Sequence, residues 1–410
     1  MRKRCALGIV AVFSVFLALT MTGCSGGGEE QVIISGPRLG MVTTTDVIIN
    51  WDTQSSSQGA VSYWAAGEGA FAGKILSRTG TDRQSVTITN LKPNTKYKFL
   101  VEGDSAVRSF TTATTEDNTS FVFVTMADNR GPSDTEDLKG LPAAFINIIN
   151  DATKRNAVFA VNAGDIFYGK NPDINTFRQL YQSFKKAIHP LASQVPYYIS
   201  PGNHEMSPFK SSKDEVGFDP VQLFKSEFPQ PAQLEGYEGT VFSWDYGKVH
   251  FVSMATNQFD HNVKIPENAM YYISEAQIKW LESDLQIAKS NGAQFIFVFG
   301  HANAYYDESW PETDVGDLQK TDIVQRDKFW DVLVTYKVDA YICGHRHFSD
   351  ISTHREVVQW MNGNSGSVSP ADGKNQYTVW TVDGSTKTVK AELVNDTGTT
   401  DYTQIFEYRK

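Results

Sequence analysis

Five short apolar runs, spread across residues 121–347, each end in a peptide rich in side chains that can bind metal ions. The runs are 121–125, 157–161, 195–199, 295–299 and 339–343. They are rich in Val, Phe and Ile and lack a 3.6-residue period, which is typical of buried strands rather than helices. Because α/β sheets assemble sites at the carboxyl ends of distant strands, the polar peptides are predicted to meet at one edge of a sheet.

These peptides supply carboxylates, an amide, a phenol and imidazoles, which are enough donors for two metal ions. A carboxylate can bridge two cations, and Asp165 is our candidate bridge because it follows a strand and a glycine directly. The imidazoles suit iron, zinc or manganese rather than calcium. The other candidate ligands are Asp128, Tyr168, Asn203, His301, His345 and His347. The sequence therefore predicts a site for two metal ions.

Taken in order, these motifs resemble those of the calcineurin-like metallophosphoesterase superfamily, and most closely its purple acid phosphatase branch. Many members of the superfamily place a His two residues after the first Asp, where this chain has Arg130. The purple acid phosphatase branch instead has a Tyr three residues after the bridging Asp, and Tyr168 stands at that position. The resemblance covers residues 119–410 and implies an αββα-sandwich domain, so the chain as a whole is expected to be α/β.

The resemblance also implies which residues bind which ion. In the family, the first ion is ferric iron and the second is a divalent ion, so we expect Fe³⁺ together with Zn²⁺, Mn²⁺ or Fe²⁺. A phenolate bound to ferric iron colours the family, and Tyr168 would supply it. The implied ligands are Asp128, Asp165, Tyr168 and His347 for the first ion, and Asp165, Asn203, His301 and His345 for the second.

The activity implied by the resemblance is hydrolysis of small phosphate monoesters by a hydroxide held on the two ions. His204 matches an outer-sphere histidine of the family, so we expect it to bind substrate as a general acid or charge stabiliser. Arg130 is interpreted as a phosphate-binding residue, with an ordinary surface arginine as the alternative. Glu205 is expected to orient its loop. Family members commonly carry another His soon after the one matching His301, but residues 302–310 contain none.

Two other functions remain compatible with the sequence. Loops at 206–233 and 302–321 would set the size of the leaving group, so a phosphodiesterase or nucleotide pyrophosphatase is the first alternative. A surface binding protein with a vestigial metal site is the second. The complete ligand set and His204 argue against it, because a site kept only for structure needs no outer-sphere histidine.

Residues 1–24 have the pattern of a secretory signal. Basic residues at 2–4 precede an apolar run at 6–19, which is too short for a stable membrane span. The end at Cys24 resembles a bacterial lipobox, so Cys24 is predicted to be lipidated. Met21 replaces the usual Leu, and plain cleavage nearby is the alternative. Residues 25–30 are a predicted flexible tether. We therefore expect an exported protein of the bacterial cell envelope, anchored by lipid at the outer face of a membrane or in the periplasm.

Residues 31–115 differ in pattern from the rest and predict an all-β domain. The predicted strands at 47–51, 60–64, 85–88, 97–102 and 107–111 are short and separated by turn residues, as in a β-sandwich. Residues 91–97 resemble the tyrosine corner of fibronectin type III domains, with Trp51 expected in the core. The following domain, 119–410, has predicted amphipathic helices at 173–188, 274–290 and 322–336.

Charge and cysteine content limit the possible partners. The formal net charge is −10, which disfavours binding to nucleic acid, so attachment to a membrane is expected to come from the lipid. Cys343 is the only cysteine beyond residue 24, so no intramolecular disulfide is expected there, and it is interpreted as a buried thiol. The sequence leaves the oligomeric state open.

Overall fold

The computed structural model describes residues 32–68, 73–131, 133–169, 173–206, 218–257, 271–305, 318, 322–367 and 372–409. The predicted signal at 1–24, its Cys24 and the tether at 25–30 lie outside these residues. No helix within the described ranges is both long and apolar enough to cross a bilayer.

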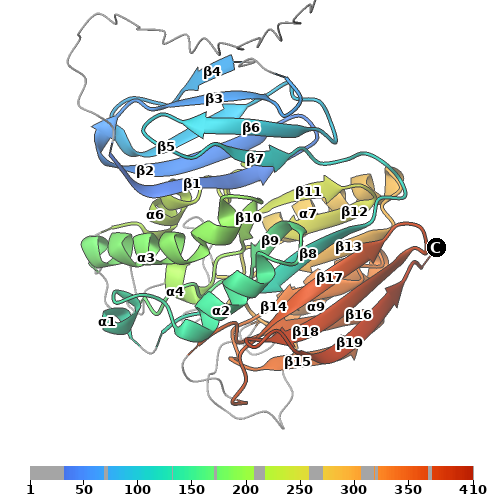
Figure 1. Cartoon of the computed structure of the whole chain (residues 1–410). Helices are drawn as coiled ribbons and strands as arrows, with labels where there is room; N and C mark the ends of the chain where they lie inside the picture. The colour runs from blue at the N-terminus through green and yellow to red at the C-terminus, as the bar shows by residue number, and fades with distance from the viewer. Residues whose placement is uncertain are drawn as a thin grey trace, which may run out of the picture. The chain divides into compact units, whose positions relative to one another are not determined.

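The N-terminal domain is a sandwich of two antiparallel sheets (Figure 1). Trp51 is fully buried between them, beside Ile49 from one sheet and Phe99 from the other. The Tyr97 hydroxyl accepts a hydrogen bond of 3.0 Å from the Lys92 N–H, as expected for a tyrosine corner. The sheets have the orders β1 (Ile33–Val42), β2 (Val47–Ser57), β5 (Thr81–Ile88) and β4 (Gly73–Leu76), β3 (Ala60–Ala65), β6 (Lys96–Val101), β7 (Arg108–Thr111). The sequence patterns did not predict β1 and β4.

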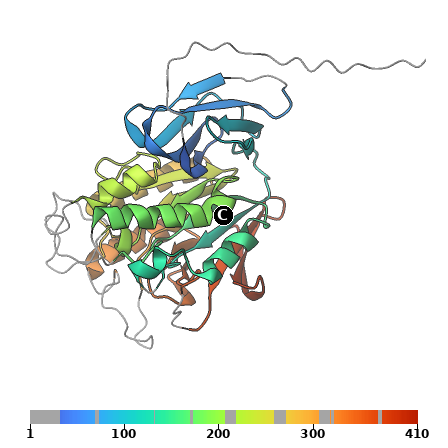
Figure 2. The same cartoon turned by 60° about the vertical axis from the view of Figure 1, so that its left-hand side comes forward.

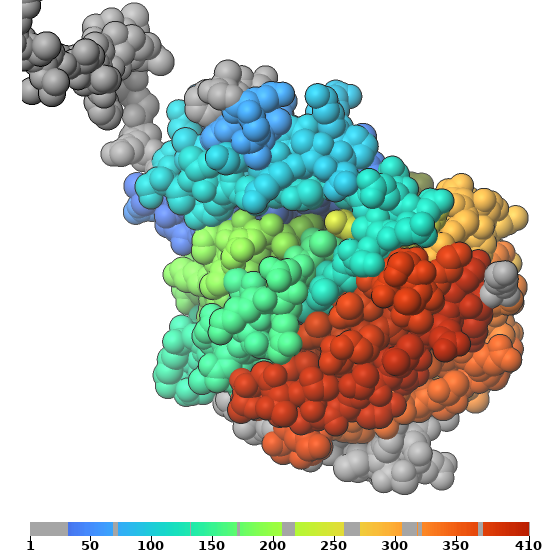
Figure 3. Space-filling view, turned by 45° about the vertical axis from the view of Figure 1, so that its right-hand side comes forward, coloured from blue at the N-terminus to red at the C-terminus, as the bar shows by residue number. Residues whose placement is uncertain are grey.

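Two six-stranded sheets form the centre of the second domain (Figures 1 and 2). In the first sheet β10, β9 and β8 are parallel, and the last three strands are antiparallel to their neighbours. Its order is β10 (Tyr197–Ile199), β9 (Ala157–Asn162), β8 (Phe121–Met126), β17 (Gln376–Asp383), β18 (Thr388–Asn395), β19 (Thr400–Glu407). The strands β17 to β19 form the broad red face in Figure 3, where most side chains of β19 are exposed.

The second sheet has four parallel strands flanked by an antiparallel strand at each edge. Its order is β11 (Phe242–Tyr246), β12 (Val249–Ser253), β13 (Phe295–Phe299), β14 (Ala340–Cys343), β16 (Val357–Asn362), β15 (Ser349–His354). Aromatic side chains fill the space between the two sheets. Phe123 of the first sheet packs against Phe251 and Phe297 of the second, with ring centroids 5.1 and 5.6 Å apart. Such burial supplies much of the stability of the layered fold.

Helices cover the outer face of each sheet, which confirms the predicted αββα order. Apolar side chains of α2 and α3 pack on the first sheet, and those of α7 and α9 pack on the second. Asp173, Ser274 and Asp322 cap the amino ends of α3, α7 and α9, where each side chain accepts a main-chain N–H. The helices are α1 (Asp134–Asp137), α2 (Ala143–Ala152), α3 (Ile174–Ala192), α4 (Asn203–Met206), α6 (Pro220–Glu227), α7 (Glu275–Ser290) and α9 (Ile323–Thr335).

Buried ion pairs join the sandwich to the helices of the second domain. Lys185 on α3 is fully buried, and its Nζ lies 3.0 Å from Asp52 Oδ2 on β2 and 2.5 Å from Glu227 Oε2 on α6. Arg38 on β1 also contacts Asp52, and Arg83 on β5 contacts Glu227. Burial alone would raise the pKa of Asp52, but the charges of Arg38 and Lys185 hold it below its usual value.

Candidate metal centre

The strand ends bring all the predicted ligands to one edge of the two sheets. Because β8, β9, β10, β13 and β14 are parallel within their sheets, their carboxyl ends present neighbouring loops. Asp128 follows β8, Asp165 and Tyr168 follow β9, Asn203 follows β10, His301 follows β13, and His345 and His347 follow β14.

Two groups of possible ligand atoms share the carboxylate of Asp165. Asp165, His301 and His345 form one group, and Asp128, Asp165 and His347 form the other, with the ligand atoms of each group within 4.8 Å of one another. Within the first group, His301 Nε2 lies 3.3 Å from Asp165 Oδ1. This geometry matches two adjacent cation sites with Asp165 as the shared ligand.

Asn203 lies next to the first of these groups. Its Oδ1 is 3.1 Å from His301 Nε2, and its side chain is buried. The amide oxygen therefore adds a neutral donor beside the imidazole and the shared carboxylate.

Several ligand atoms are buried without a hydrogen-bond partner among the described residues. These atoms are Asp128 Oδ1 and both ring nitrogens of His345. Burial raises the pKa of Asp128 well above its usual value and lowers the pKa of His345 well below its own. Burying unpaired polar atoms is costly, and buried charges are normally paired or coordinated to metal. The donor set therefore fits two metal ions, and its imidazoles favour transition metals.

Four of the candidate ligands have a left-handed backbone. Their φ angles are 53° at Asp128, 56° at Asp165, 80° at His345 and 57° at His347. Such conformations cost about 1–3 kcal/mol each and persist where the surrounding structure fixes them, often at functional sites. Gly344 allows the approach of one ligand, because a Cβ there would lie 2.4 Å from Asp128 Oδ2.

The predicted role of Glu205 agrees with its contacts. Its buried carboxylate accepts main-chain N–H groups from Asp165, Ile166 and Gly202, at 3.0, 2.9 and 2.7 Å. Burial and the nearby Asp165 raise its pKa to about 7. His301 is oriented in a similar way, because its Nδ1–H donates to the Ala163 carbonyl at 2.7 Å and leaves Nε2 directed to Asp165.

His204 lies beside the shared carboxylate. Its Nε2 is 3.5 Å from Asp165 Oδ2, while its Nδ1–H donates to the Tyr168 carbonyl. Burial lowers the pKa of His204 to about 3, although Asp165 acts to raise it. Because Nδ1 carries the donated proton, Nε2 is the ring nitrogen that faces Asp165.

Arg130 and Tyr168 lie together at the same edge. The Arg130 guanidinium carbon is 5.2 Å from the centroid of the Tyr168 ring, and that ring is 5.5 Å from the ring of His204. Arg130 Nη2 is also 2.8 Å from His347 Nε2, and Arg130 Nε is 3.7 Å from Asp165 Oδ2. The structure therefore brings Arg130 into contact with two candidate ligands, His347 and Asp165. An ordinary surface arginine would not have such contacts.

Residues not predicted from the sequence connect these loops beneath the ligands. Asn162 donates to the side chain of Asn129 and accepts the Gly164 N–H. Asp137 on α1 accepts the N–H groups of Gly131 and Tyr168. Burial raises the pKa of Asp137 to about 6. In the sequence Asp137 is one of three acidic residues in a short helix, and nothing in that pattern distinguishes it from its neighbours.

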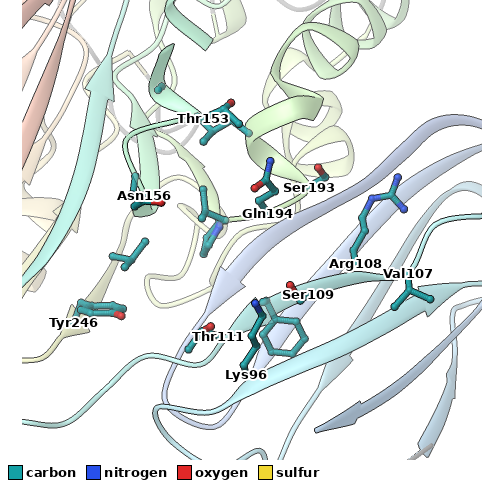
Figure 4. Close-up of a pocket in the computed structure, with 17 residues that line it drawn as sticks. Lys96, Val107, Arg108, Ser109, Thr111, Thr153, Asn156, Ser193, Gln194 and Tyr246 are labelled. Atoms are coloured by element: carbon teal, nitrogen blue, oxygen red, sulfur yellow. The ribbon is translucent and has the colours of Figure 1, made fainter. Parts of the chain in front are cut away.

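A separate polar cleft of about 540 Å³ is lined by residues of β6 and β7 and by the segments that follow α2 and α3 (Figure 4). Lys96 and Arg108 line it from the sandwich, and Thr153 and Gln194 line it from the second domain. The cleft adjoins the amino ends of β9 and β10, opposite to the end that carries the ligands. None of the candidate ligands lines it, so it is not part of the metal centre.

Comparisons of the sequence with family models give two matches. The calcineurin-like phosphoesterase family matches residues 133–349, and the purple acid phosphatase N-terminal domain matches residues 30–112. The second match covers the sandwich under its own family name, so the fibronectin type III resemblance stays a prediction.

Individual relatives and a solved structure agree with these matches. Probable purple acid phosphatase 20 of Arabidopsis thaliana is 22% identical over 83% of this chain and 77% of its own length. Human acid phosphatase type 7 is 28% identical over a segment that covers 50% of this chain and 43% of the human protein. A purple acid phosphatase from yellow lupin (Lupinus luteus) seeds has the same fold, with a TM-score of 0.69 and 16% identity over 90% of this chain and 74% of that one.

Proposed function

Because this chain belongs to the calcineurin-like phosphoesterase family and carries the N-terminal domain of purple acid phosphatases, it is a metal-dependent phosphoesterase, and we propose that it hydrolyses phosphate monoesters. The observation that carries the proposal is the pair of ligand groups that share Asp165. The relatives described above are named phosphatases, so the comparisons do not favour the diesterase alternative.

The residues of this chain fit the dinuclear chemistry of that family. Two bound ions would activate water and neutralise a phosphate between them. Asp165 would be shared by the ions, with Asn203, His301 and His345 on one side and Asp128, Tyr168 and His347 on the other. Iron with a divalent ion is the pair we propose, because Tyr168 would add a phenol to the group of Asp128, Asp165 and His347.

His204 is proposed to act on the substrate rather than on an ion. Its Nδ1–H is donated to the Tyr168 carbonyl, which fixes the ring, and Nε2 lies beside Asp165. When the ring is protonated, its Nε2–H can donate a hydrogen bond to a phosphate oxygen or a proton to the leaving group. Arg130 adds a forked donor for the remaining phosphate oxygens.

Turnover of two chromogenic substrates tests the proposal. The purified protein, supplied with iron and zinc, is assayed on p-nitrophenyl phosphate and on bis-p-nitrophenyl phosphate, beside an Asp165→Asn variant. We expect the monoester to be cleaved faster and the activity to fall by more than a hundredfold in the variant, since the shared ligand is lost. Faster cleavage of the diester would overturn the monoester assignment, and absence of metal-dependent cleavage of both would overturn the enzyme.

We further propose that the protein is exported and held at a membrane by a lipid on Cys24. The support is the sequence alone, namely the basic and apolar pattern of residues 1–24 and the small residues before Cys24. In a bacterial host, the wild-type protein should partition into detergent and incorporate labelled fatty acid, and Cys24→Ala should do neither. Equal labelling of both proteins would contradict the anchor.

A further inference from the structure

One buried carboxylate connects two loops of the metal centre. Asp137 is fully buried on α1, between the loop that follows β8 and the loop that follows β9. Its Oδ1 accepts the Gly131 N–H at 2.6 Å, and its Oδ2 accepts the Tyr168 N–H at 2.7 Å. Each oxygen therefore holds the main chain of a different loop.

The contact has a strict chemical requirement. A carboxylate can accept a hydrogen bond at both oxygens, whereas the amide of asparagine has one accepting oxygen and one donating NH₂ group. Only the acid can therefore satisfy both N–H groups. The approach also requires a glycine, because a Cβ on Gly131 would lie 2.1 Å from Asp137 Oδ1.

The main chain of Asp137 is in turn held from the helical layer. The Ser183 hydroxyl on α3 donates to the main-chain carbonyl of Asp137 at 2.8 Å. α3 packs on the first sheet, so Asp137 links the ligand loops to a rigid part of the fold. Sites built in this way keep their geometry better than sites on free loops.

We propose that Asp137 is a positioning residue of the metal centre, which sets the position of Tyr168 relative to the loop of Asp128 and Arg130. This inference rests on the proposed function of the site. Gly131 directly follows Arg130, and the main chain of Tyr168 is held on both sides, at its N–H by Asp137 and at its carbonyl by His204. A change at Asp137 therefore reaches Tyr168 and His204 together, although Asp137 belongs to neither group of candidate ligands.

Two variants and one control test this role. Asp137→Asn removes one acceptor at constant size, and Gly131→Ala disturbs the same contact while keeping the acid. Glu136→Gln is the matched control, because Glu136 is exposed on the same helix and undergoes the same chemical change. The readouts are the visible absorption of the iron-loaded protein, the affinity for Zn²⁺ by calorimetry, and kcat/KM on p-nitrophenyl phosphate.

We expect both variants to shift or weaken the visible absorption, because it reports the phenol of Tyr168. Loss of a residue that orients ligands typically lowers metal affinity or activity by roughly 10- to 100-fold, and we expect a loss of that size in Zn²⁺ affinity and in kcat/KM. Glu136→Gln should match the wild type in all three measurements.

Folded variants with unchanged absorption, Zn²⁺ affinity and kcat/KM would overturn the proposal. If Asp137→Asn does not fold, Gly131→Ala decides by the same readouts, and failure of both to fold would show a purely structural role and overturn it as well. A wild-type protein that binds metal without turnover would refute the proposed function only, since absorption and Zn²⁺ affinity would still report on Asp137.

Discussion

Arg130 stands two residues after the first ligand, and its contacts support a role in binding phosphate. Its guanidinium lies over Tyr168 and within 2.8 Å of His347. A hydrogen bond to a charged group contributes about 1.5–3 kcal/mol. We therefore predict that Arg130→Gln lowers kcat/KM on p-nitrophenyl phosphate by roughly 10- to 100-fold, mostly through a higher KM.

Metal content separates this role from a structural one. Arg130→Gln should retain the iron and zinc content of the wild type, and Arg178→Gln should leave the kinetics unchanged, because Arg178 is exposed on α3. A variant that loses metal but keeps the KM of its loaded fraction would instead make Arg130 part of the ligand scaffold.

The candidate ligands could be named from the sequence because each lies within a few residues of the end of an apolar run. A strand end fixes where the next few residues must lie, so Asp128, Asp165 and His301 follow from local pattern alone. Asp137 could not be found in this way. Gly131 precedes it by 6 residues and Tyr168 follows it by 31, beyond α2 and β9, and only the folded chain brings the three together.

At the scale of elements, many strands and the three longest helices were predicted, but the loop conformations were not. Helices α3, α7 and α9 begin next to Asp173, Ser274 and Asp322, whose capping side chains are a local signal. The left-handed backbone at Asp165 and at His345 has no such signal, since non-glycine residues rarely adopt it. Long-range contacts, such as the one between Glu205 and Asp165, hold these loops in place.

His250 on β12 links that strand to α7 and to β11 through charge. Its Nδ1 lies 2.7 Å from Asp245 and its Nε2 lies 2.9 Å from Asp284. Burial alone would lower the pKa of His250, but the hydrogen bonds that the ring donates to these two carboxylates raise it to about 9. Because the pKa is higher in the folded state, this stabilisation is complete below about pH 6.5 and is lost as the pH rises through about 9.

Urea unfolding of wild type and His250→Gln at pH 6 and pH 10 checks this dependence. A tenfold difference in proton affinity corresponds to about 1.4 kcal/mol. The rise of the His250 pKa from 6.5 to about 9 sets the upper limit of the stabilisation. Because the Asp245 carboxylate is largely exposed, solvent screening lowers this stabilisation to about 2 kcal/mol. The free-energy difference between the two proteins should therefore shrink by about 2 kcal/mol from pH 6 to pH 10. A difference that is the same at both pH values would rule out the charge contribution.

At the scale of the whole molecule, the sequence predicted two domains but not how they are joined. Lys185 and Asp52 are 133 residues apart in the chain. Nothing in the local pattern of α3 marks Lys185 as buried, since a lysine on an amphipathic helix is normally on its solvated face. The ion pairs of Lys185 form only in the folded chain, where Asp52 of β2 and Glu227 of α6 both reach α3.

This buried network should make the sandwich and the second domain unfold together. Lys185→Met leaves Asp52 and Glu227 buried with one cation fewer, and breaking a buried pair in this way costs about 3–5 kcal/mol. We predict that calorimetry shows one transition for the wild type and an earlier, separate transition of the sandwich in Lys185→Met.

Lys186→Met is the control, because Lys186 is an exposed neighbour on α3, and this variant should retain the single transition. Kinetics on p-nitrophenyl phosphate below the first transition should change little, because none of the network residues is a candidate ligand. A single, unshifted transition in Lys185→Met would mean that apolar packing of β1 against α3 and β10 is what couples the domains.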